Sequence, residues 1–309
     1  MKIDLHTITT HSKEIFHRLR WGRTGVCCVR CGSTNIAIKD NNHRCRDCDH
    51  RFSDTSGTIF HSSKLPLSKW LYAIYLFCTQ SRGISSYNLS RLISVSQPTA
   101  WRMLHLIRSV IVIEFDLGDT IHIDEVFVGA DWKKMPFKQK LKKCQKYGIT
   151  IPPPRGTTKM DQEMYKGVLR HYMKKASNLD KTCVLGLRAF NRRSLILIPT
   201  TLTQCRSLVK SQINAQITDV QRLVTDETNS YDKLTPHHSK NNHSKHIYTD
   251  EDGYSNNPLE GAFSHLKRMF KGIYTSCHKK NLSYYLNEFC FRYSYPDPQQ
   301  RIELIFGWC

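Results

Sequence analysis

Three carboxylates and one lysine have the types and positions that metal-dependent phosphoryl chemistry requires. Asp124 lies inside the apolar run "TIHIDEVFV", Asp226 ends the run "VQRLVTD", and Glu260 opens a helical pattern in which Lys267 follows two turns later. Three like charges in one cleft repel one another unless cations bind them. Mg²⁺ or Mn²⁺ prefers such oxygen ligands and stabilises the attacking and leaving oxygens of a phosphoryl displacement. Lys267 would then hold a phosphate of the substrate strand.

The elements expected to carry this set are two strands and the first turn of a helix that begins near Pro258. A carboxylate in the first turn lies near the positive end of its helix. Spacing alone does not decide between one shared site and separate positions, because a chain with 26 acidic residues contains many such triples.

A second constellation, of four cysteines, lies near the N-terminus in "CCVRCGSTNIAIKDNNHRCRDCDHRF". Cys28 and Cys31 form one CxxC pair, and Cys45 and Cys48 form another, which is the spacing that suits a tetrahedral zinc ion. Cys27 competes with Cys28 for the first position, but only Cys28 leaves the two-residue spacer. The turn-rich segment between the pairs, flanked by short apolar runs, predicts a zinc ribbon.

Helices are expected after this ribbon. The stretch "KLPLSKWLYAIYLFCTQ" at 64–80 has apolar residues at helical spacing and predicts a buried helix. The next stretch predicts a helix from about Ser85, a turn at 94–96 and a second helix from about Gln97, with Pro98 in its first turn. This is the pattern of a helix-turn-helix motif, although an ordinary helical hairpin would read similarly.

In a helix-turn-helix motif, the first residues of the second helix contact base edges in the major groove. The sequence therefore nominates Gln97, Thr99 and Arg102 as base-reading residues. Arg108, further along the same helix, is predicted to contact a phosphate.

The remainder of the chain alternates strand and helix patterns. Strands are expected in "TCVLGLRAF" and "RRSLILIPT", and a helix in "TLTQCRSLVKSQINAQI". The segment 131–181 is strongly basic and contains the breaker "IPPPRG", which predicts an irregular insertion that contacts nucleic acid or is simply a solvated surface loop. Residues 237–246, "HHSKNNHSKH", are expected to form an exposed loop that holds a possible active-site histidine, His238 or His243.

The charge of the chain favours a polyanionic partner. The chain has 46 lysine and arginine residues against 26 aspartate and glutamate residues, so its net charge is +20. A charge of this sign and size favours binding to nucleic acid, through long-range electrostatic attraction and through the release of counterions. The first residues lack the apolar core of a signal peptide, and no long apolar run predicts a membrane span. The sequence therefore predicts an intracellular protein without membrane contact, in a bacterial cytoplasm or a eukaryotic nucleus.

Several motifs together resemble a known family. The stretches "CRDCDHRFSDTSGTIFHSSKLPLSKWLYAIYLF", "VSQPTAWRMLHLIR", "IDEVFVGA", "SNNPLEGAFSHLKRMFKGIY" and "KNLSYYLNEFCFRYS" look like insertion-sequence transposases of the zinc-ribbon, DDE-type group, to which eukaryotic Merlin-type elements are related. The similarity runs from about Cys28 to Tyr293. Because the motifs agree in order as well as in content, the resemblance is more specific than any one of them.

This resemblance implies an α/β fold with an RNase H-like mixed-sheet catalytic domain. Asp124 and Asp226 match the two metal-binding aspartates of the family, Glu260 its third acid, and Lys267 the partner position seven residues on. Some members are described with asparagine as the third catalytic residue, so Asn257 is the alternate to Glu260. The implied cofactors are structural Zn²⁺ and catalytic Mg²⁺ or Mn²⁺.

The resulting expectation is a DNA transposase that binds terminal inverted repeats and catalyses strand cleavage and strand transfer. Its domains are expected at 1–60 (zinc ribbon), 61–115 (helix-turn-helix region) and 116–309 (catalytic domain). Its partner would be double-stranded DNA, and pairing of two ends implies a homodimer or higher oligomer by analogy with the family. The alternative is a catalytically inactive or domesticated sequence-specific DNA-binding protein derived from such a transposase.

Overall fold

The structure is a computed structural model of the full sequence. The residues that it describes are 5–22, 24–39, 42–113, 118–129, 132, 135–153, 156–190, 192–201, 205–216, 220–226, 231–232, 235, 237–241, 254–255, 257–274 and 277–308.

The N-terminal part joins two short helices to a small sheet. Its elements are α1 (Leu5–Thr10), α2 (Ser12–Trp21), β1 (Ile36–Lys39), β2 (Asn42–Cys45) and β3 (Arg51–Ser53). The three strands pair antiparallel in the order β1-β2-β3. Trp21 at the end of α2 packs against Phe52 of β3 and against Cys28 and Cys45. This core has few apolar residues, so burial of apolar side chains alone is not expected to stabilise the N-terminal part.

A helical module follows, formed by α3 (Leu67–Thr79), α4 (Ser86–Leu92) and α5 (Gln97–Ser109). Ser85 and Ser96 cap α4 and α5, because their side chains accept the backbone N–H groups of Asn88 and Thr99. Both helices and the turn between them lie where the sequence predicted them. The turn includes Ser94, whose φ of 53° is in the left-handed region.

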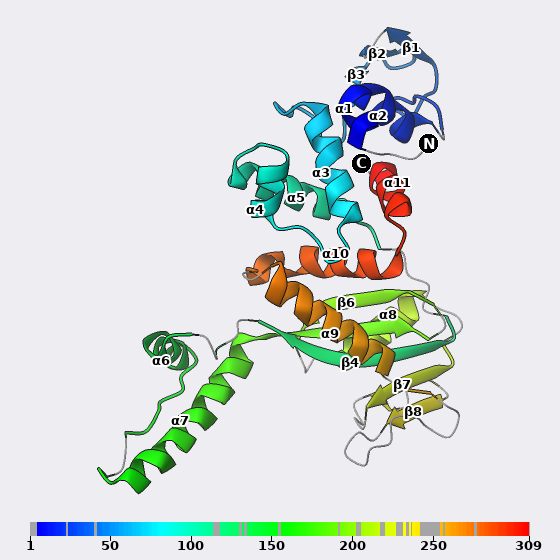
Figure 1. The fold of residues 1–309 in the computed structure, drawn as a ribbon. Coiled ribbons are helices and arrows are strands. Elements are labelled where there is room, and N and C mark those ends of the chain that lie inside the picture. Colours follow the sequence, from blue (N-terminus) through cyan, green and yellow to red (C-terminus); the bar gives the residue numbers. More distant parts are fainter. Residues whose placement is uncertain are drawn as a thin grey trace.

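The core of this module also includes the two ends of the chain. Ile15 and Phe16 of α2 and Phe306 of α11 (Pro298–Trp308) are buried with Trp70 and Phe77 of α3. The predicted boundaries had assigned 298–308 to the catalytic domain, whereas α11 packs against α2 and α3 (Figure 1).

A five-stranded mixed sheet forms the centre of the second half of the chain. Its strands are β4 (Thr120–Val128), β5 (Thr182–Ala189), β6 (Leu195–Thr200), β7 (Arg222–Asp226) and β8 (His237–Asn241). They lie in the order β6-β5-β4-β7-β8, in which β6, β5 and β4 pair antiparallel, whereas β7 and β8 run parallel to β4. The predicted strands at β4 to β7 are therefore present, and β4 is central.

Helices cover both faces of this sheet. On one face, α9 (Asn257–Gly272) packs on β4 and β5, and α10 (Leu282–Ser294), which follows the short helix η5 (Lys279–Asn281), packs on β6. On the other face, α8 (Cys205–Gln216) contributes Cys205 and Val209 to a core with Leu185 and Leu223. The fold is therefore α/β, and Figure 1 shows α10 between the sheet and the helical module.

The prediction that the insertion at 131–181 is irregular is wrong. Between β4 and β5 lie two helices, α6 (Phe137–Lys146) and α7 (Lys159–Asp180), and α7 projects away from the sheet (Figure 1). Lysine, glutamine, methionine and leucine are strong helix formers, so a basic stretch need not be a loop. Asp180 holds the base of the insertion together, because it accepts hydrogen bonds from Trp132 Nε1 at 3.0 Å, from Tyr147 Oη at 2.6 Å and from Lys143.

The predicted loop at 237–246 is also partly wrong. Residues 237–241 form β8, which pairs parallel with β7. Asn, Ser and Lys side chains gave no strand signal here, whereas the neighbouring strand supplies the hydrogen bonds that stabilise β8. The remainder of this segment, including His243, lies outside the described residues.

Among the described residues, no helix has both the length and the apolar character needed to cross a lipid bilayer.

A buried ionic network joins the helical module to the sheet half. Glu288 of α10 accepts a hydrogen bond from Arg108 of α5 at 2.7 Å and another from Arg292 at 2.7 Å. Tyr274 donates to the same carboxylate at 2.8 Å, and Arg292 also donates to the carbonyl of Gln80 at 2.6 Å. Because Glu288, Arg108 and Arg292 are all buried, each charge depends on its partners.

Removal of the Glu288 carboxylate should strongly destabilise the protein. Glu288→Ala leaves two buried guanidinium groups without their counter-ion, and we expect the free energy of unfolding to fall by about 3–5 kcal/mol. The matched control is Glu163→Ala, which removes an exposed pair with Lys166 and should change the free energy of unfolding far less, because solvent screens exposed pairs. Urea denaturation of both variants measures the difference, and equal stabilities would contradict the role given to Glu288.

The same network predicts the pH dependence of stability. Burial alone would raise the pKa of Glu288, but Arg108 and Arg292 outweigh it and hold this pKa below the ordinary value of 4.5. A carboxyl whose pKa is lowered by folding contributes stability that is present above its ordinary pKa and lost as the pH falls through the folded value. We expect this contribution to disappear on acidification below pH 4.5 and to be absent from Glu288→Ala.

Candidate metal and nucleic-acid sites

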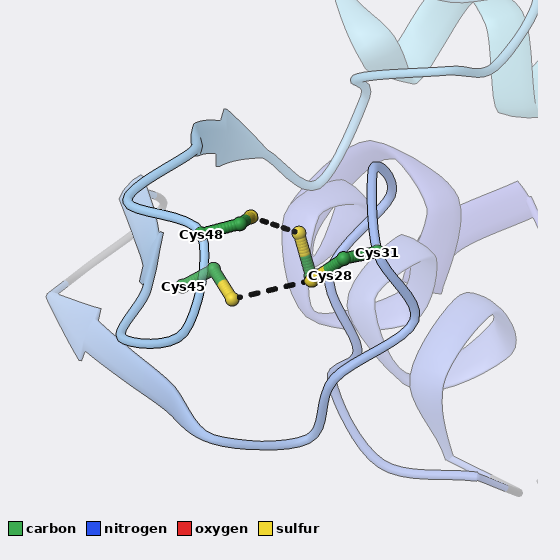
Figure 2. A group of neighbouring side chains, drawn as sticks. All are labelled: Cys28, Cys31, Cys45 and Cys48. Carbon is green, nitrogen blue, oxygen red and sulfur yellow. Dashed lines mark hydrogen bonds between the residues drawn. The ribbon is translucent and has the colours of Figure 1, made fainter.

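The four predicted zinc ligands come together in space. Cys28 Sγ lies 3.6 Å from Cys48 Sγ, and Cys31 Sγ lies 3.6 Å from Cys45 Sγ. All four sulfurs lie within 4.8 Å of one another, and Figure 2 shows them facing a common centre. Sulfurs that each lie about 2.3 Å from a zinc ion stand about 3.8 Å apart at the corners of a tetrahedron. The spacing of these thiols therefore fits a Cys₄ zinc site.

Local hydrogen bonds favour the thiolate form at Cys28 and Cys45, whereas contacts with neighbouring thiols raise the pKa of Cys31 and Cys48. Burial raises the pKa of the Cys28 thiol, but backbone N–H groups of Arg30 and Cys31 and the thiols of Cys31 and Cys48 outweigh it and lower this pKa to about 7. A backbone hydrogen bond at Cys48 likewise lowers the pKa of Cys45. Because a metal ion binds the thiolate form, the hydrogen bonds at Cys28 and Cys45 favour the binding of an ion by these two residues. Cys27 is half-buried and does not belong to the group of four.

A second polar cluster fixes α2 to the ribbon, and the sequence had not suggested it. Asp54, after β3, bonds to His43 Nε2 at 2.7 Å, to His17 Nδ1 at 3.0 Å and to Trp21 Nε1 at 2.9 Å. Arg20 donates to the backbone carbonyl of the same residue. These bonds link α2 to β2 and to the segment after β3, so they set the position of the helix relative to the four thiols.

The orientation of Asp124 follows from its partner across the sheet. Asp124 of β4 lies directly opposite Gly186 of β5, and opposed residues of antiparallel strands project to the same face. A Cβ at Gly186 would lie 2.7 Å from Phe263 Cζ of α9 and 3.3 Å from Leu259 Cδ1. Gly186 thus allows α9 to approach this face closely, and Asp124 lies on the face that α9 covers.

The neighbouring carboxylate points the other way. Glu125 pairs with Leu185, which is buried in the core on the α8 face, and Tyr231 donates a hydrogen bond to Glu125. Alternation along β4 therefore separates two adjacent acidic residues onto opposite faces of the sheet. Of these two carboxylates, Asp124 is the one on the face that α9 covers.

Asp226 occupies the matching position on the next strand. In the parallel pairing of β4 with β7, His122 is in register with Val224. Asp124 and Asp226 each follow two residues later, and Asp226 is the last residue of β7. This register, continued for two residues past the last pair, aligns Asp226 with Asp124.

Glu260 and Lys267 are both exposed on α9. The buried side of this helix consists of Leu259, Ala262, Phe263, Leu266 and Met269. Glu260 adjoins Leu259, which packs over Gly186, so it belongs to the part of α9 that lies across β4 and β5. The alternate residue, Asn257, is exposed at the first position of the helix, and its N–H donates to Ser255 Oγ at 3.2 Å.

One cation on this face escaped the sequence analysis. Arg188 of β5 is opposite His122, and its Nε donates to Tyr293 Oη of α10 at 2.8 Å. It lies two residues beyond Gly186 and therefore projects to the same face as Asp124. An arginine inside the otherwise apolar run "TCVLGLRAF" is the signal that could have identified it.

Gly186 should be intolerant of a side chain. Gly186→Ala places a methyl group against the ring of Phe263, and we expect a loss of about 1–3 kcal/mol in the free energy of unfolding because α9 must shift. Gly167→Ala is the control, because a Cβ at this exposed position of α7 meets no atom within 4 Å and removes a glycine from a helix. A Gly186→Ala protein as stable as the wild type in urea would refute this packing.

Two of the predicted base-reading residues are exposed at the start of α5. Gln97 is exposed, and its Nε2 donates to Ser86 Oγ of α4 at 2.8 Å. Arg102 is exposed on the next turn. Thr99 is half-buried, and its hydroxyl lies 2.8 Å from Ser96 Oγ, so it contributes to the cap of the helix.

The prediction for Arg108 is wrong. Its side chain is 1% exposed and forms an ion pair with Glu288, with the guanidinium carbon 4.3 Å from the centroid of the Tyr285 ring. A buried guanidinium bound to a carboxylate is not available to a DNA phosphate. The helical pattern alone could not show this, because its partner lies in α10, far along the chain.

Fold and sites together describe an α/β protein with a mixed sheet, acidic residues at neighbouring strand positions and a Cys₄ cluster near the N-terminus. The family model of the ISXO2-like transposase domain matches residues 116–294, which include the whole sheet, α9 and α10. The match covers more than half of the chain. The chain belongs to this family, and the predicted resemblance to insertion-sequence transposases is confirmed.

A curated relative comes from the archaeon Halobacterium salinarum. It is described as an uncharacterized protein in transposable element ISH50, and it is 29% identical over 140 residues. The aligned region covers 43% of this chain and 46% of the relative, so the chain spans less than half the length of that protein.

Proposed function

We propose that the protein is a DNA transposase, which binds the ends of a mobile element and catalyses metal-dependent strand cleavage and strand transfer. The observation that carries the proposal is the arrangement of acidic positions within the matched family domain. Asp124 is on the central strand, Asp226 is at the matching position of the adjacent parallel strand, and Glu260 is on the helix that covers the same face as Asp124.

The sheet supports an RNase H-like assignment of this domain. Its first three strands form an antiparallel meander, and its last two join the free side of β4 in parallel. This order puts β4 in the centre and puts β7 next to it. The candidate catalytic aspartates then come from adjacent strands, although they are far apart in sequence.

The donor set fits hard divalent cations. In the proposed site, Asp124, Asp226 and Glu260 would hold Mg²⁺ or Mn²⁺, whose preferred ligands are carboxylate oxygens. Such ions, when bound, activate the attacking oxygen and neutralise the charge on the leaving oxygen. The protein needs no covalent intermediate, because its task is to hold the DNA strands in line with the reacting phosphate.

The remaining residues of the site position DNA. Lys267 is exposed two turns after Glu260 on α9 and would bind a phosphate of the strand to be cut. Arg188 adds a positive charge on the face of the sheet that carries Asp124. Asn257, in the first turn of α9, stays the alternate to Glu260 as the third catalytic residue.

DNA recognition is proposed for the helical module and the ribbon. The pair α4 and α5 would act as a helix-turn-helix motif, with Gln97 and Arg102 at the base edges and Thr99 at the start of the reader helix. The Cys₄ site would hold structural zinc and present the exposed Arg30, Arg44 and Arg46 to the DNA backbone. Pairing of two element ends would require a homodimer or a higher oligomer.

The second candidate function is DNA binding without catalysis. A domesticated regulator would retain the ribbon and the reader helix but not the acidic site. Asp124 and Asp226 are both present on adjacent strands, which favours the catalytic function over DNA binding alone.

Excision in cells tests the proposal. A donor plasmid carries a marker between the element's own ends, and the protein is expressed in trans. We expect loss of the marker only with intact ends, and no excision when the ends are scrambled. Binding to intact ends without any excision would favour the DNA-binding alternative.

A further inference from the structure

An exposed group of aromatic side chains lies where α5 meets the first turn of α10. Trp101 of α5 is 44% exposed and Tyr284 of α10 is 37% exposed, with the half-buried His105 between them. We call Trp101, His105 and Tyr284 the aromatic platform. Trp70 and Phe77 of α3 are buried in the core of the module, whereas the rings of Trp101 and Tyr284 are open to solvent, and a group of open rings indicates a binding role.

The rings of the platform contact one another. The centroids of Trp101 and His105 are 4.1 Å apart, and those of His105 and Tyr284 are 5.9 Å apart with the rings nearly perpendicular. Tyr285 lies behind His105, with its hydroxyl 3.4 Å from His105 Nε2. Burial and the nearby Arg108 lower the pKa of His105 to about 4, so its ring is neutral near pH 7. The platform is therefore an ordered, uncharged surface.

Exposed cations adjoin these rings along the chain. Arg102 is exposed next to Trp101, and Lys279 and Lys280 are exposed in η5, immediately before α10. Helix α5 contains no acidic residue, and the one acidic residue of α10, Glu288, is buried in the ionic network. Exposed rings beside cations suit a nucleic acid, because bases stack on the rings and phosphates bind the cations.

The paired bases of a duplex are already stacked on their neighbours, so open rings of a protein accept a base that has left the stack. The position of the platform agrees with this occupant, because α10 lies between the helical module and the sheet (Figure 1).

We propose that Trp101, His105 and Tyr284 form a binding site for an unpaired nucleotide of DNA, with its phosphates on Lys279 and Lys280. This inference rests on the proposed function and adds to it, because it assigns single-stranded DNA as a ligand. The site would hold a base that is unpaired at the end of the element when the strand is cut.

Binding of a short oligothymidylate, measured by fluorescence anisotropy at fixed salt, tests the proposal. We expect Trp101→Ala and Tyr284→Ala to weaken this binding about tenfold, because stacking on one aromatic ring contributes on that order. Affinity for a fully paired duplex of the same length should change less than about twofold. Trp101→Phe keeps a ring and should retain most of the affinity for the oligothymidylate.

The matched control is Phe137→Ala, which removes an exposed aromatic ring of α6 outside the platform and should leave both affinities unchanged. Unchanged oligothymidylate binding by Trp101→Ala would overturn the proposal and point to a protein as the occupant. An equal loss on duplex and oligothymidylate would also overturn it. Failure of the wild type to excise an element would contradict the transposase proposal instead, so the two failures are distinguishable.

Discussion

Asp124→Asn is expected to reduce DNA cleavage by at least about 100-fold while leaving folding and DNA binding intact. The substitution keeps the shape of the side chain but removes the charge that would hold the catalytic ion. Changes outside the ligand shell of a metal site already cost about 10- to 100-fold, so loss of a ligand should cost more. A cleavage assay with end-labelled DNA and Mg²⁺ or Mn²⁺ measures the effect.

The chain provides a closely matched control in the next residue. Glu125→Gln makes the same kind of change on the opposite face of β4, where the amide oxygen can still accept the hydrogen bond from Tyr231. We expect this variant to cleave within about threefold of the wild type, well below the loss expected of a metal ligand. Equal activity of the Asp124 and Glu125 variants would remove the reason for placing catalysis on the α9 face.

The second large effect is expected at the Cys₄ site. Cys28→Ser should abolish zinc binding and unfold the ribbon, because structural zinc contributes about 10–16 kcal/mol in small zinc domains and the ribbon core is small. Metal analysis should find about one zinc ion per chain in the wild type and almost none in the variant. Limited proteolysis should then cut the ribbon of the variant.

Cys27→Ser is the control for this prediction, because Cys27 is adjacent in sequence but does not belong to the group of four thiols. It should keep its zinc and its resistance to protease. Zinc loss from Cys27→Ser but not from Cys28→Ser would exchange the roles of the two cysteines.

The sequence was informative where the relevant contacts are local. The two CxxC pairs lie close together in the chain, so their spacing predicted a group of four that the structure brings together. The helices α3, α4 and α5 also begin and end near the predicted positions, because capping serines, Pro98 and apolar periodicity are local signals.

Long-range partners explain the errors. Arg108 looked like a phosphate contact because its buried counter-ion, Glu288, lies on a distant helix. The strand β8 gains its hydrogen bonds from β7, which its polar sequence does not reveal. Within the insertion, Asp180 gathers Trp132, Lys143 and Tyr147 into a small polar core, so the segment is more ordered than its charge suggested.

The acidic site shows both kinds of information. Strand patterns located Asp124 and Asp226, and a helical pattern located Glu260, but no local signal shows that these strands are neighbours. The register of β4 with β7 and the close approach of α9 at Gly186 supply that link. Asn257 and Glu260 both lie in the first turn of α9, so their positions alone do not show which of them is the third catalytic residue. A cleavage assay of variants at the two positions decides between them.

The most direct test of the central claim is cleavage and strand transfer on a labelled DNA that carries the element's own ends, with Mg²⁺ or Mn²⁺. The wild type, Glu260→Gln and Asn257→Ala are compared at protein concentrations that bind the same fraction of the DNA. We predict that the wild type and Asn257→Ala cut the DNA and that Glu260→Gln does not. A wild type that binds the ends but cuts with neither metal would contradict the account, and cleavage by Glu260→Gln but not by Asn257→Ala would move the third catalytic position to Asn257.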